Sequence, residues 1–280
     1  MIYREVAPDP KLQRYIKCFW LLDHDYRDSF HDHERLWADV HTELIFTSGQ
    51  RYFTKTGKRK TVLPTNFVIG PYQKQLELFS SGRTALVAAR FWPWGFHMVS
   101  RIAMSRLKNT VQSISNVFAG KKALAADLAR IGNPQAKIAA LERALLNILE
   151  ANEPKFLSRD VAVDILEAKG VVRVADLGRK HRLQARRLER IFLDEIGMPA
   201  KIFSRIVRFN HAMNMIQRNP DIDLLSLTYA CGYADQAHFT RNFREMFGIT
   251  PAGFKASMQR WRKRSRENRP DVVFVQDRPE

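Results

Sequence analysis

One stretch of the chain is repeated within it. The segment LERIFLDEIGMPAKIF at 188–203 aligns without a gap with FTRNFREMFGITPAGF at 239–254. In this alignment Arg190 falls on Arg241, and two aromatic residues and a glycine also coincide. With the residues before it, each copy predicts a short helix, a turn, a longer helix ended by glycine, and a helix opened by proline. This order is that of a helix-turn-helix motif with a supporting helix behind it.

One predicted helix joins the two copies. The amphipathic segment Pro199–Arg218 opens on proline and ends before Asn-Pro-Asp. A single helix-turn-helix pattern is a weak signal, whereas two in tandem joined by one helix of about twenty residues are specific. We predict an all-α domain over 156–262, with helices at 158–169, 174–180, 184–195, 199–218, 223–230, 235–247 and 251–260. Ser158 is the expected N-cap of the first helix, and the basic tail 263–280 is expected to be poorly ordered.

The longer helix of the second copy has an apolar and a polar face. At about 100° per residue, its three phenylalanines and Met246 share one face that must be buried. Gln236 lies at the N-terminal tip, and Gly232 precedes it where the turn needs a positive φ. The outward residues suit base edges, since Gln can form two hydrogen bonds with adenine and Arg can form two with guanine. They are Gln236, Ala237, His238, Arg241 and Arg244.

The first copy follows the same plan. Leu188, Ile191 and Phe192 point inward, and Gln184 lies at the tip. The outward residues are Arg186, Arg187 and Arg190. A solvated face on a helical bundle is the alternative interpretation of either helix taken alone. The repeat, the turn residues and the charge of the chain favour a DNA-reading face instead.

The charge of the chain favours a polyanionic partner. The formal net charge of the 280 residues is +17, and the isoelectric point is about 10.2. These values indicate nucleic acid first and an anionic membrane surface second. The excess is spread over both halves, with a local concentration at 173–190. Two cysteines, Cys18 and Cys231, argue against a disulfide framework and against a four-ligand zinc site, and we expect a cytosolic protein.

At the repeated residues the sequence resembles the AraC/XylS family of bacterial transcription regulators. The segments that carry the resemblance begin VADLGRKHRLQARRLERIFLDEIG at 174, AKIFSRIVRFNHAMNMIQ at 200 and LSLTYACGYADQAHFTRNFREMFGITPAGFK at 225. The resemblance implies that each monomer places two recognition helices in successive major grooves, roughly 34 Å apart. Carried over by position, it implies base contacts from Arg186, Glu189, Arg190, Gln236, Ala237, His238 and Arg241, with Arg187 nearer the DNA backbone.

The sequence departs from the family pattern in the first motif. Arg182 occupies the turn position where the family usually has glycine, at a cost of about 1 kcal/mol if it adopts a left-handed conformation. Gly178 and Thr228 stand where alanine is commoner in the helices that position the recognition helices. We therefore expect the first motif to be the looser of the two.

The first half of the chain predicts a β-rich domain. Short β-prone runs punctuated by Gly, Pro and Ser fill 43–93, and their spacing favours an antiparallel barrel or sandwich. A turn and a short helix are expected before the apolar strand that contains Cys18. Amphipathic helices are expected at 121–131 and from Pro134 to about 151, with a hinge near Pro154. The predicted fold is thus α+β, with domain 1–155 ahead of the helical domain.

This half resembles, more weakly, the cupin-like N-terminal domain of a subgroup of the family. The segment 70–95, GPYQKQLELFSSGRTALVAARFWPWG, carries that likeness. The resemblance implies an effector-binding or dimerising domain, with a dimer contact through the helical segment 121–151. The expected partners are double-stranded DNA, a small-molecule effector, a second copy of the chain and RNA polymerase. No cofactor and no membrane partner are expected.

Candidate effector residues are His33, His41, Glu43, Arg90, Trp92 and Trp94. Trp92, Trp94 and Phe96 would share one side if they continued a strand, and core or dimer packing is the alternative to a ligand cage. A metal-binding or enzymatic cupin with an accessory DNA module is the competing interpretation, because period two puts His31 and His33 on one face. Glu34 would lie on the other face, and no Ser/His/Asp order, P-loop or GxGxxG is present. The sequence therefore predicts a regulator rather than an enzyme, without a metal.

Overall fold

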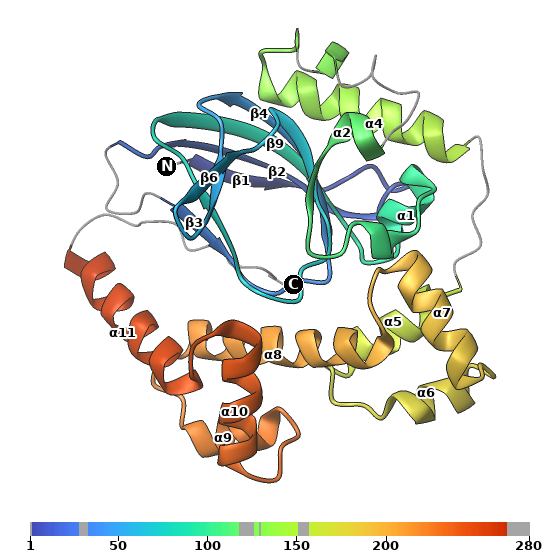
Figure 1. Ribbon diagram of the computed structural model, residues 1–280, viewed down its shortest axis with the longest axis vertical. Coiled ribbons are helices and arrows are strands. Elements are labelled where there is room, and N and C mark those ends of the chain that lie inside the picture. Colours follow the sequence, from blue (N-terminus) through green and yellow to red (C-terminus); the bar gives the residue numbers. More distant parts are fainter. Residues whose placement is uncertain (1, 28–32, 118–125, 129, 151–156, 268–280) are drawn as a thin grey trace.

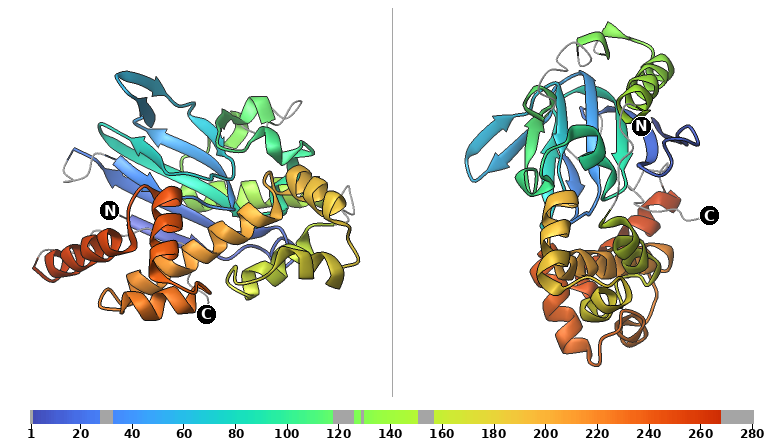
Figure 2. Two further views of the ribbon diagram at one scale, coloured as in Figure 1. Left: turned by 60° about the horizontal axis from the view of Figure 1, so that its bottom comes forward. Right: turned by 90° about the vertical axis from the view of Figure 1, so that its right-hand side faces the viewer.

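The computed structural model describes residues 2–27, 33–117, 126–128, 130–150 and 157–267. Figure 1 shows a β-rich domain with a group of helices beneath it, and both views in Figure 2 place these helices on one side of the sheets. The strands of the first domain are β1 Ile2–Val6, β2 Ile16–Asp25, β3 His33–Leu36, β4 Thr42–Gly49, β5 Phe53–Thr56, β6 Arg59–Val62, β7 Asn66–Ile69, β8 Leu76–Phe79, β9 Arg83–Phe91 and β10 Val111–Ser113. Its helices are α1 Gly95–Ser100, the 3₁₀ turn η1 Met104–Arg106, α2 Ile114–Val117 and α4 Pro134–Glu150.

The strands form two antiparallel sheets. A six-stranded sheet has the order β1-β2-β9-β4-β7-β10, and a four-stranded sheet has the order β3-β8-β5-β6. The alternation of residues along β2 explains how they pack, because successive side chains point to opposite faces. Trp20 and Leu22 belong to the core that also includes Leu78 of the smaller sheet. Phe19 and Leu21 pack on the other face with the residues of α1 and α4, so the larger sheet is covered on both sides.

The apolar stripe of α4 is therefore used within the domain. Ile138, Leu141, Leu145 and Leu149 are buried in the core on the outer face of the six-stranded sheet. The helix begins where the sequence predicts, and the Asn133 side chain caps it by accepting a hydrogen bond from the Ala136 amide at 2.9 Å. Most of the helix expected at 121–131 lies outside the described residues.

Two local predictions in the first domain are wrong. The helix expected before β2 is a set of turns, with Leu12 and Tyr15 donating to backbone oxygens three residues earlier. The strand that contains Arg90 ends at Phe91, so Trp92, Trp94 and Phe96 do not alternate along it. Pro93 lacks the N–H that would extend the ladder. The two indole rings instead stack, with centroids 5.9 Å apart.

The second domain contains the helices that the sequence predicts. They are α5 Arg159–Glu167, α6 Val174–Lys180, α7 Ala185–Glu195, α8 Ala200–Arg218, α9 Leu224–Ala230, α10 Gln236–Phe247 and α11 Pro251–Glu267. The observed and predicted ends agree within two residues for every helix except α11. This helix continues past its predicted end at Arg260 into the expected basic tail. The hinge predicted near Pro154 and residues 268–280 lie outside the described residues.

The start of α5 is stabilised differently from the prediction. Ser158 occupies the N-cap, but its side chain makes no cap hydrogen bond. The carboxylate of Glu195, at the end of α7, accepts hydrogen bonds from the amides of Ser158 at 2.9 Å and Leu157 at 3.2 Å. Glu195 is buried, and an anion is favoured at a helix N-terminus. Helices α7 and α5 are thus fixed to each other.

The two domains share an apolar interface. Ala38, Val40 and Trp94 of the first domain lie in the same cluster as the helical core. Trp37 meets Phe247 of α10 and Phe254 of α11 edge-on, with ring centroids 5.7 and 5.8 Å apart. The β-rich domain therefore contacts the C-terminal end of α10 directly.

Candidate nucleic-acid interface

Two helix-turn-helix units lie at opposite ends of α8. One consists of α6 and α7, the other of α9 and α10, and α8 connects them (Figure 1). The turns close with the same hydrogen bond: the amide of Leu183 donates to Gly178 at 2.8 Å, and that of Tyr233 donates to Thr228 at 3.1 Å. The second turn has one more residue before its recognition helix begins. The helices of the two units therefore correspond, and the one-residue difference between the units lies in the turn.

The residue at the corresponding position of each turn has a left-handed backbone conformation. Arg182 has φ 54° and Gly232 has φ 69°. A Cβ on Gly232 would come within 2.5 Å of Val171 Cγ1, so glycine is required there for space as well as for backbone conformation. At Arg182 a residue with a side chain adopts the left-handed conformation, which is energetically unfavourable for any residue except glycine.

We expect Arg182→Gly to raise the free energy of unfolding by about 1 kcal/mol, because glycine removes the strain of a left-handed side chain. Urea unfolding followed by circular dichroism measures the change. Gly232→Ala is the matched variant at the other turn, and it should lower stability. If both substitutions changed the free energy of unfolding in the same direction, the proposed difference in backbone strain between the two turns would be wrong.

A cluster of aromatic rings fixes the orientation of α10. Phe209 of α8 lies at its centre, with ring centroids 5.7 Å from Phe243 and 5.9 Å from Phe247. Phe239 and Phe243 are fully buried. The Asp235 side chain caps the helix by accepting a hydrogen bond from the His238 amide at 2.7 Å. Since the apolar face cannot rotate out of this cluster, the polar face of α10 is held toward solvent.

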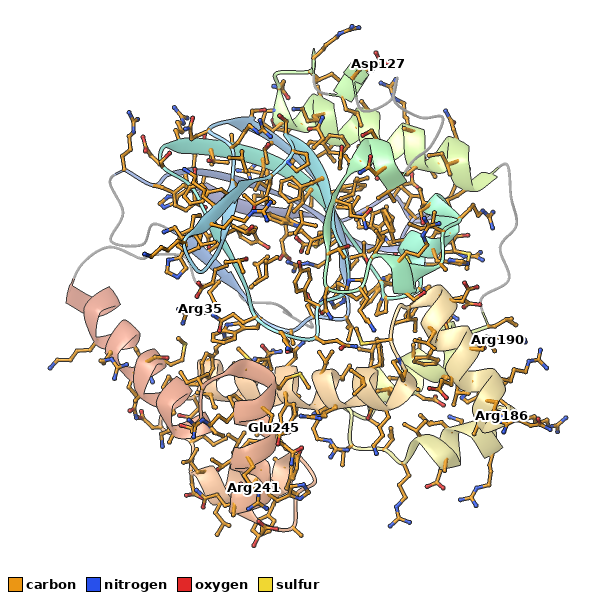
Figure 3. The ribbon with its side chains drawn as sticks, viewed as in Figure 1. Arg35, Asp127, Arg186, Arg190, Arg241 and Glu245 are labelled. Atoms are coloured by element: carbon orange, nitrogen blue, oxygen red, sulfur yellow. The ribbon has the colours of Figure 1, made fainter. Side chains whose placement is uncertain are left out.

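The predicted DNA-contacting residues are all exposed. They are Gln184, Arg186, Arg187, Glu189 and Arg190 on or next to α7, and Gln236, Ala237, His238, Arg241 and Arg244 on α10. Figure 3 shows Arg186 and Arg190 along the outer side of α7 and Arg241 on α10, at the other end of the domain. Within the described residues none of these arginines forms an ion pair. Their guanidinium groups are therefore available to an external partner.

Other charged side chains near these helices are engaged within the protein. Arg205 of α8 pairs with Glu245 at 3.0 Å, which directs this carboxylate toward α8. Lys180 lies 2.7 Å and His181 2.6 Å from Asp164 of α5, and these contacts lower the pKa of Asp164. The sequence alone did not separate these structural charges from the free ones, because their partners lie on other helices.

The effector candidates divide into two groups. Glu43 and Arg90, together with His33, line a cavity of about 490 Å³. The Arg90 guanidinium lies 2.6 Å from the Glu43 carboxylate, and both side chains are buried. Burial raises the pKa of Glu43, and the charge of Arg90 opposes that shift.

His41, Trp92 and Trp94 do not line this cavity. The His41 ring lies 2.8 Å from Asp39. The indoles of Trp92 and Trp94 donate to the backbone oxygens of Gln13 and Arg14, both at 2.9 Å. These side chains hold loops and the domain interface together.

The cavity is not confined to the β-rich domain. Its apolar wall includes Trp20, Leu22, Ile45, Phe67, Leu78 and Leu86 from the sheets. The helical domain closes it with Asn210, Met213, Asn214, Gln217, Phe254, Met258 and Arg260 from α8 and α11. The Gln217 side-chain oxygen is buried and has no hydrogen-bond partner among the described atoms. These residues were not among the effector candidates predicted from the sequence, because they come from the domain assigned to DNA binding.

Across the described part of the chain, no three His, Cys, Asp or Glu side chains come close enough to hold a metal ion. His33 stacks on Phe79, with ring centroids 4.9 Å apart, and the His97 ring lies 2.8 Å from the Ile102 carbonyl oxygen. His31 lies outside the described residues. None of the helices among those residues combines the length and apolar character needed to cross a bilayer.

Two helix-turn-helix units that expose arginines from aromatic-backed helices define a DNA-binding class of domain. Residues 177–257 match a family described as a helix-turn-helix domain, and residues 4–113 match a domain of unknown function, DUF6597. The match over 177–257 supports the resemblance to the AraC/XylS family drawn from the sequence of this domain.

Individual relatives cover different parts of the chain. The HTH-type transcriptional regulator GlxA of Rhizobium meliloti is 27% identical over 90 residues, which are 32% of this chain and 26% of that protein. Among solved structures, ToxT from Vibrio cholerae aligns over 84% of this chain and 98% of its own, with a TM-score of 0.44 and 12% identity. A ToxT structure with a bound unsaturated fatty acid gives a TM-score of 0.42 at 9% identity, over 84% of this chain and 94% of that one.

Proposed function

We propose that the protein is a sequence-specific transcription regulator that inserts α7 and α10 into successive major grooves of DNA. One observation carries this proposal: two helices of the same repeat, each fixed by a buried apolar face, expose arginines at the two ends of one connecting helix. None of these arginines forms an ion pair with another described residue. Helices held in this way can present their side chains to base edges without the backbone first being ordered. The formal net charge of +17 supports the same partner.

Base and phosphate contacts would have different effects. Gln236, His238 and Arg241 occupy the first half of α10, where recognition helices reach bases. Arg187 and Arg244 would lie closer to the backbone and add affinity without sequence choice. Arg186, Glu189 and Arg190 would supply base contacts from α7.

Selection of bound sites from a random pool of duplexes tests the proposal. We expect an enriched site with two conserved blocks whose centres lie about one helical turn, or 10–10.5 base pairs, apart. Binding that shows no preference among sequences at moderate salt would contradict the proposal and indicate a nonspecific nucleic-acid-binding protein.

Arg241→Ala should weaken binding to the selected site by about 1–3 kcal/mol and relax the preference at a single base position. The reason is that a guanidinium can make two hydrogen bonds to guanine, which alanine cannot replace. Titration of fluorescent duplexes that carry all four bases at each position measures both effects. Arg59→Ala, on strand β6, is the matched control for loss of one positive charge. A uniform loss across all duplexes would mean that Arg241 contacts phosphate.

We further propose that a small-molecule effector binds in the cavity lined by Arg90, Glu43 and Gln217. Most of the wall is apolar, while polar groups converge from both domains, as is typical of ligand sites. The unpartnered oxygen of Gln217 would accept a hydrogen bond from the ligand. Since α8 and α11 close the cavity, occupancy would be coupled to the placement of the recognition helices.

A compound screen read by thermal stability tests this effector site. A true effector should stabilise the wild-type chain and change its affinity for DNA, because a ligand that binds only one state shifts the equilibrium toward that state. Met213→Phe, which fills the cavity from α8, should abolish the stabilisation while leaving DNA binding in place. Equal stabilisation of this variant would place the ligand elsewhere.

A homodimer through residues 121–151 and a contact with RNA polymerase are also proposed from the family resemblance. Because the apolar stripe of α4 packs on its own sheet, a dimer contact on this helix would use its outer residues, which include Gln135, Ala139 and Arg143. Sedimentation of the full chain with and without an Ala139→Glu substitution tests this surface. An unchanged dimer would exclude it.

A further inference from the structure

The β-rich domain also reaches the first recognition helix. The 3₁₀ turn η1 packs directly against α7. Gly197, just after α7, approaches it so closely that an added Cβ would come within 2.7 Å of the Met104 carbonyl oxygen and 3.1 Å of Pro71. Gly197 has φ 92°, a conformation that glycine adopts readily. This contact fixes η1 beside the helix that carries Arg186 and Arg190.

An open hollow lies between η1 and the exposed side of α7. It has a volume of about 430 Å³, and its lining residues are Ser105, Arg186, Glu189, Arg190, Leu193 and Asp194. Ser105 is therefore next to the side of α7 that carries three of the predicted DNA-contacting residues. Any duplex read by this side must run past η1.

The residues of η1 that face solvent suit a phosphate backbone. Met104 and Leu107 are buried, whereas Ser105 and Arg106 are exposed. Lys108 lies two residues after the end of η1 and is half-buried. Within the described residues neither Arg106 nor Lys108 forms an ion pair. The Ser105 hydroxyl thus lies beside α7, and two cationic residues follow it within three positions of the chain.

The dimensions of DNA identify the occupant of that edge. The major groove is about 12 Å wide, and a helix with its side chains is about 10–12 Å wide. A helix in the groove therefore fills it, and the groups immediately beside the helix are the phosphates of the flanking strand. Serine hydroxyls, arginine and lysine are typical phosphate ligands.

We propose that η1 of the β-rich domain and the turn after it are part of the DNA interface, where Ser105, Arg106 and Lys108 bind phosphates beside the groove that α7 enters. This inference rests on the proposed function of α7. The regulatory domain then contributes affinity without sequence information, and its position determines how tightly the first motif is held. The weaker turn at Arg182 would gain an external support in this way.

The test measures the affinity of the full chain for its selected duplex as a function of salt. In Arg106→Gln/Lys108→Gln, the slope of log K against log salt should become less negative by about 1–2, since each phosphate contact contributes about 0.9. The affinity near 150 mM salt should fall about fivefold for each lost contact, equally for matched and mismatched duplexes. Lys58→Gln/Arg59→Gln, on the β5–β6 hairpin, removes the same charge elsewhere and should leave the slope nearly unchanged.

Two results would overturn the inference. An unchanged slope and affinity in the η1 variant, with an unaltered melting temperature, would show that this turn does not touch DNA. Tighter binding by the variant, or by Gly197→Ala, which forces η1 away from α7, would show that the turn obstructs the duplex. Failure of the proposed function would appear earlier, as a wild-type chain that shows no preference among DNA sequences. That measurement is made before any variant is compared, so the two failures can be distinguished.

Discussion

Replacing Phe243 by alanine should lower the free energy of unfolding by about 3–5 kcal/mol, because a large ring is removed from a closely packed core. The side chain is 0% exposed. Its ring contacts Phe239, Phe247 and Phe209, with centroids 5.8, 4.9 and 5.7 Å away. The cavity would open at the centre of the cluster that joins α8, α10 and α11, so few neighbours could move in to fill it.

Urea unfolding of the two proteins at one pH measures this loss. Arg244→Ala, at the next position of α10 but exposed, is the matched control and should change stability by less than about 0.5 kcal/mol. DNA selectivity at the second half-site should weaken together with stability in Phe243→Ala, since the polar face of α10 would lose its support. An unchanged unfolding midpoint would contradict the assignment of the two faces of this helix.

Glu43→Ala should lower the free energy of unfolding by about 3–5 kcal/mol, since it leaves the buried Arg90 guanidinium without its counter-charge. Arg90 and Glu43 are 4% and 8% exposed, so both charged groups are largely removed from bulk water. The pair links β4 to β9 across their ladder, where Glu43 lies opposite Arg90. Removal of one member therefore affects the centre of the six-stranded sheet.

Replacement of both members separates charge from shape. Glu43→Leu combined with Arg90→Met removes the ion pair and keeps apolar volume, so it should restore most of the stability lost in Glu43→Ala. Thermal unfolding of the single and double variants gives the comparison. A double variant as unstable as Glu43→Ala would show that packing, rather than the unpaired charge, causes the loss. The double variant should also weaken effector binding, because both side chains line the cavity.

The helical domain was largely predictable from the sequence because its signals are local. Aromatic residues three and four apart fix the buried face of α10, and proline and glycine mark the ends of the helices within a few residues. The exposure of Arg190 and Arg241 follows from the same periodicity. The repeat added what a single motif lacks, since it placed two such helices on either side of α8.

Other features depend on residues far apart in the chain. Trp92 and Trp94 follow a strand, but whether they bind a ligand or an adjacent loop depends on Gln13 and Arg14, about eighty residues earlier. The N-cap of α5 was expected from Ser158, and its place is taken by Glu195 from another helix. Local pattern identifies the group that needs a partner, while packing selects the partner.

The amino-acid sequence by itself determined the class of domain, the two recognition helices and the faces they expose, because hydrophobic periodicity and turn chemistry act over a few neighbouring residues. Only the tertiary structure brought α8 and α11 onto the β-rich domain to close one cavity, and placed Ser105 beside Arg186. Those contacts arise where two apolar surfaces from distant segments become buried against each other, and no short-range pattern records which surfaces will meet.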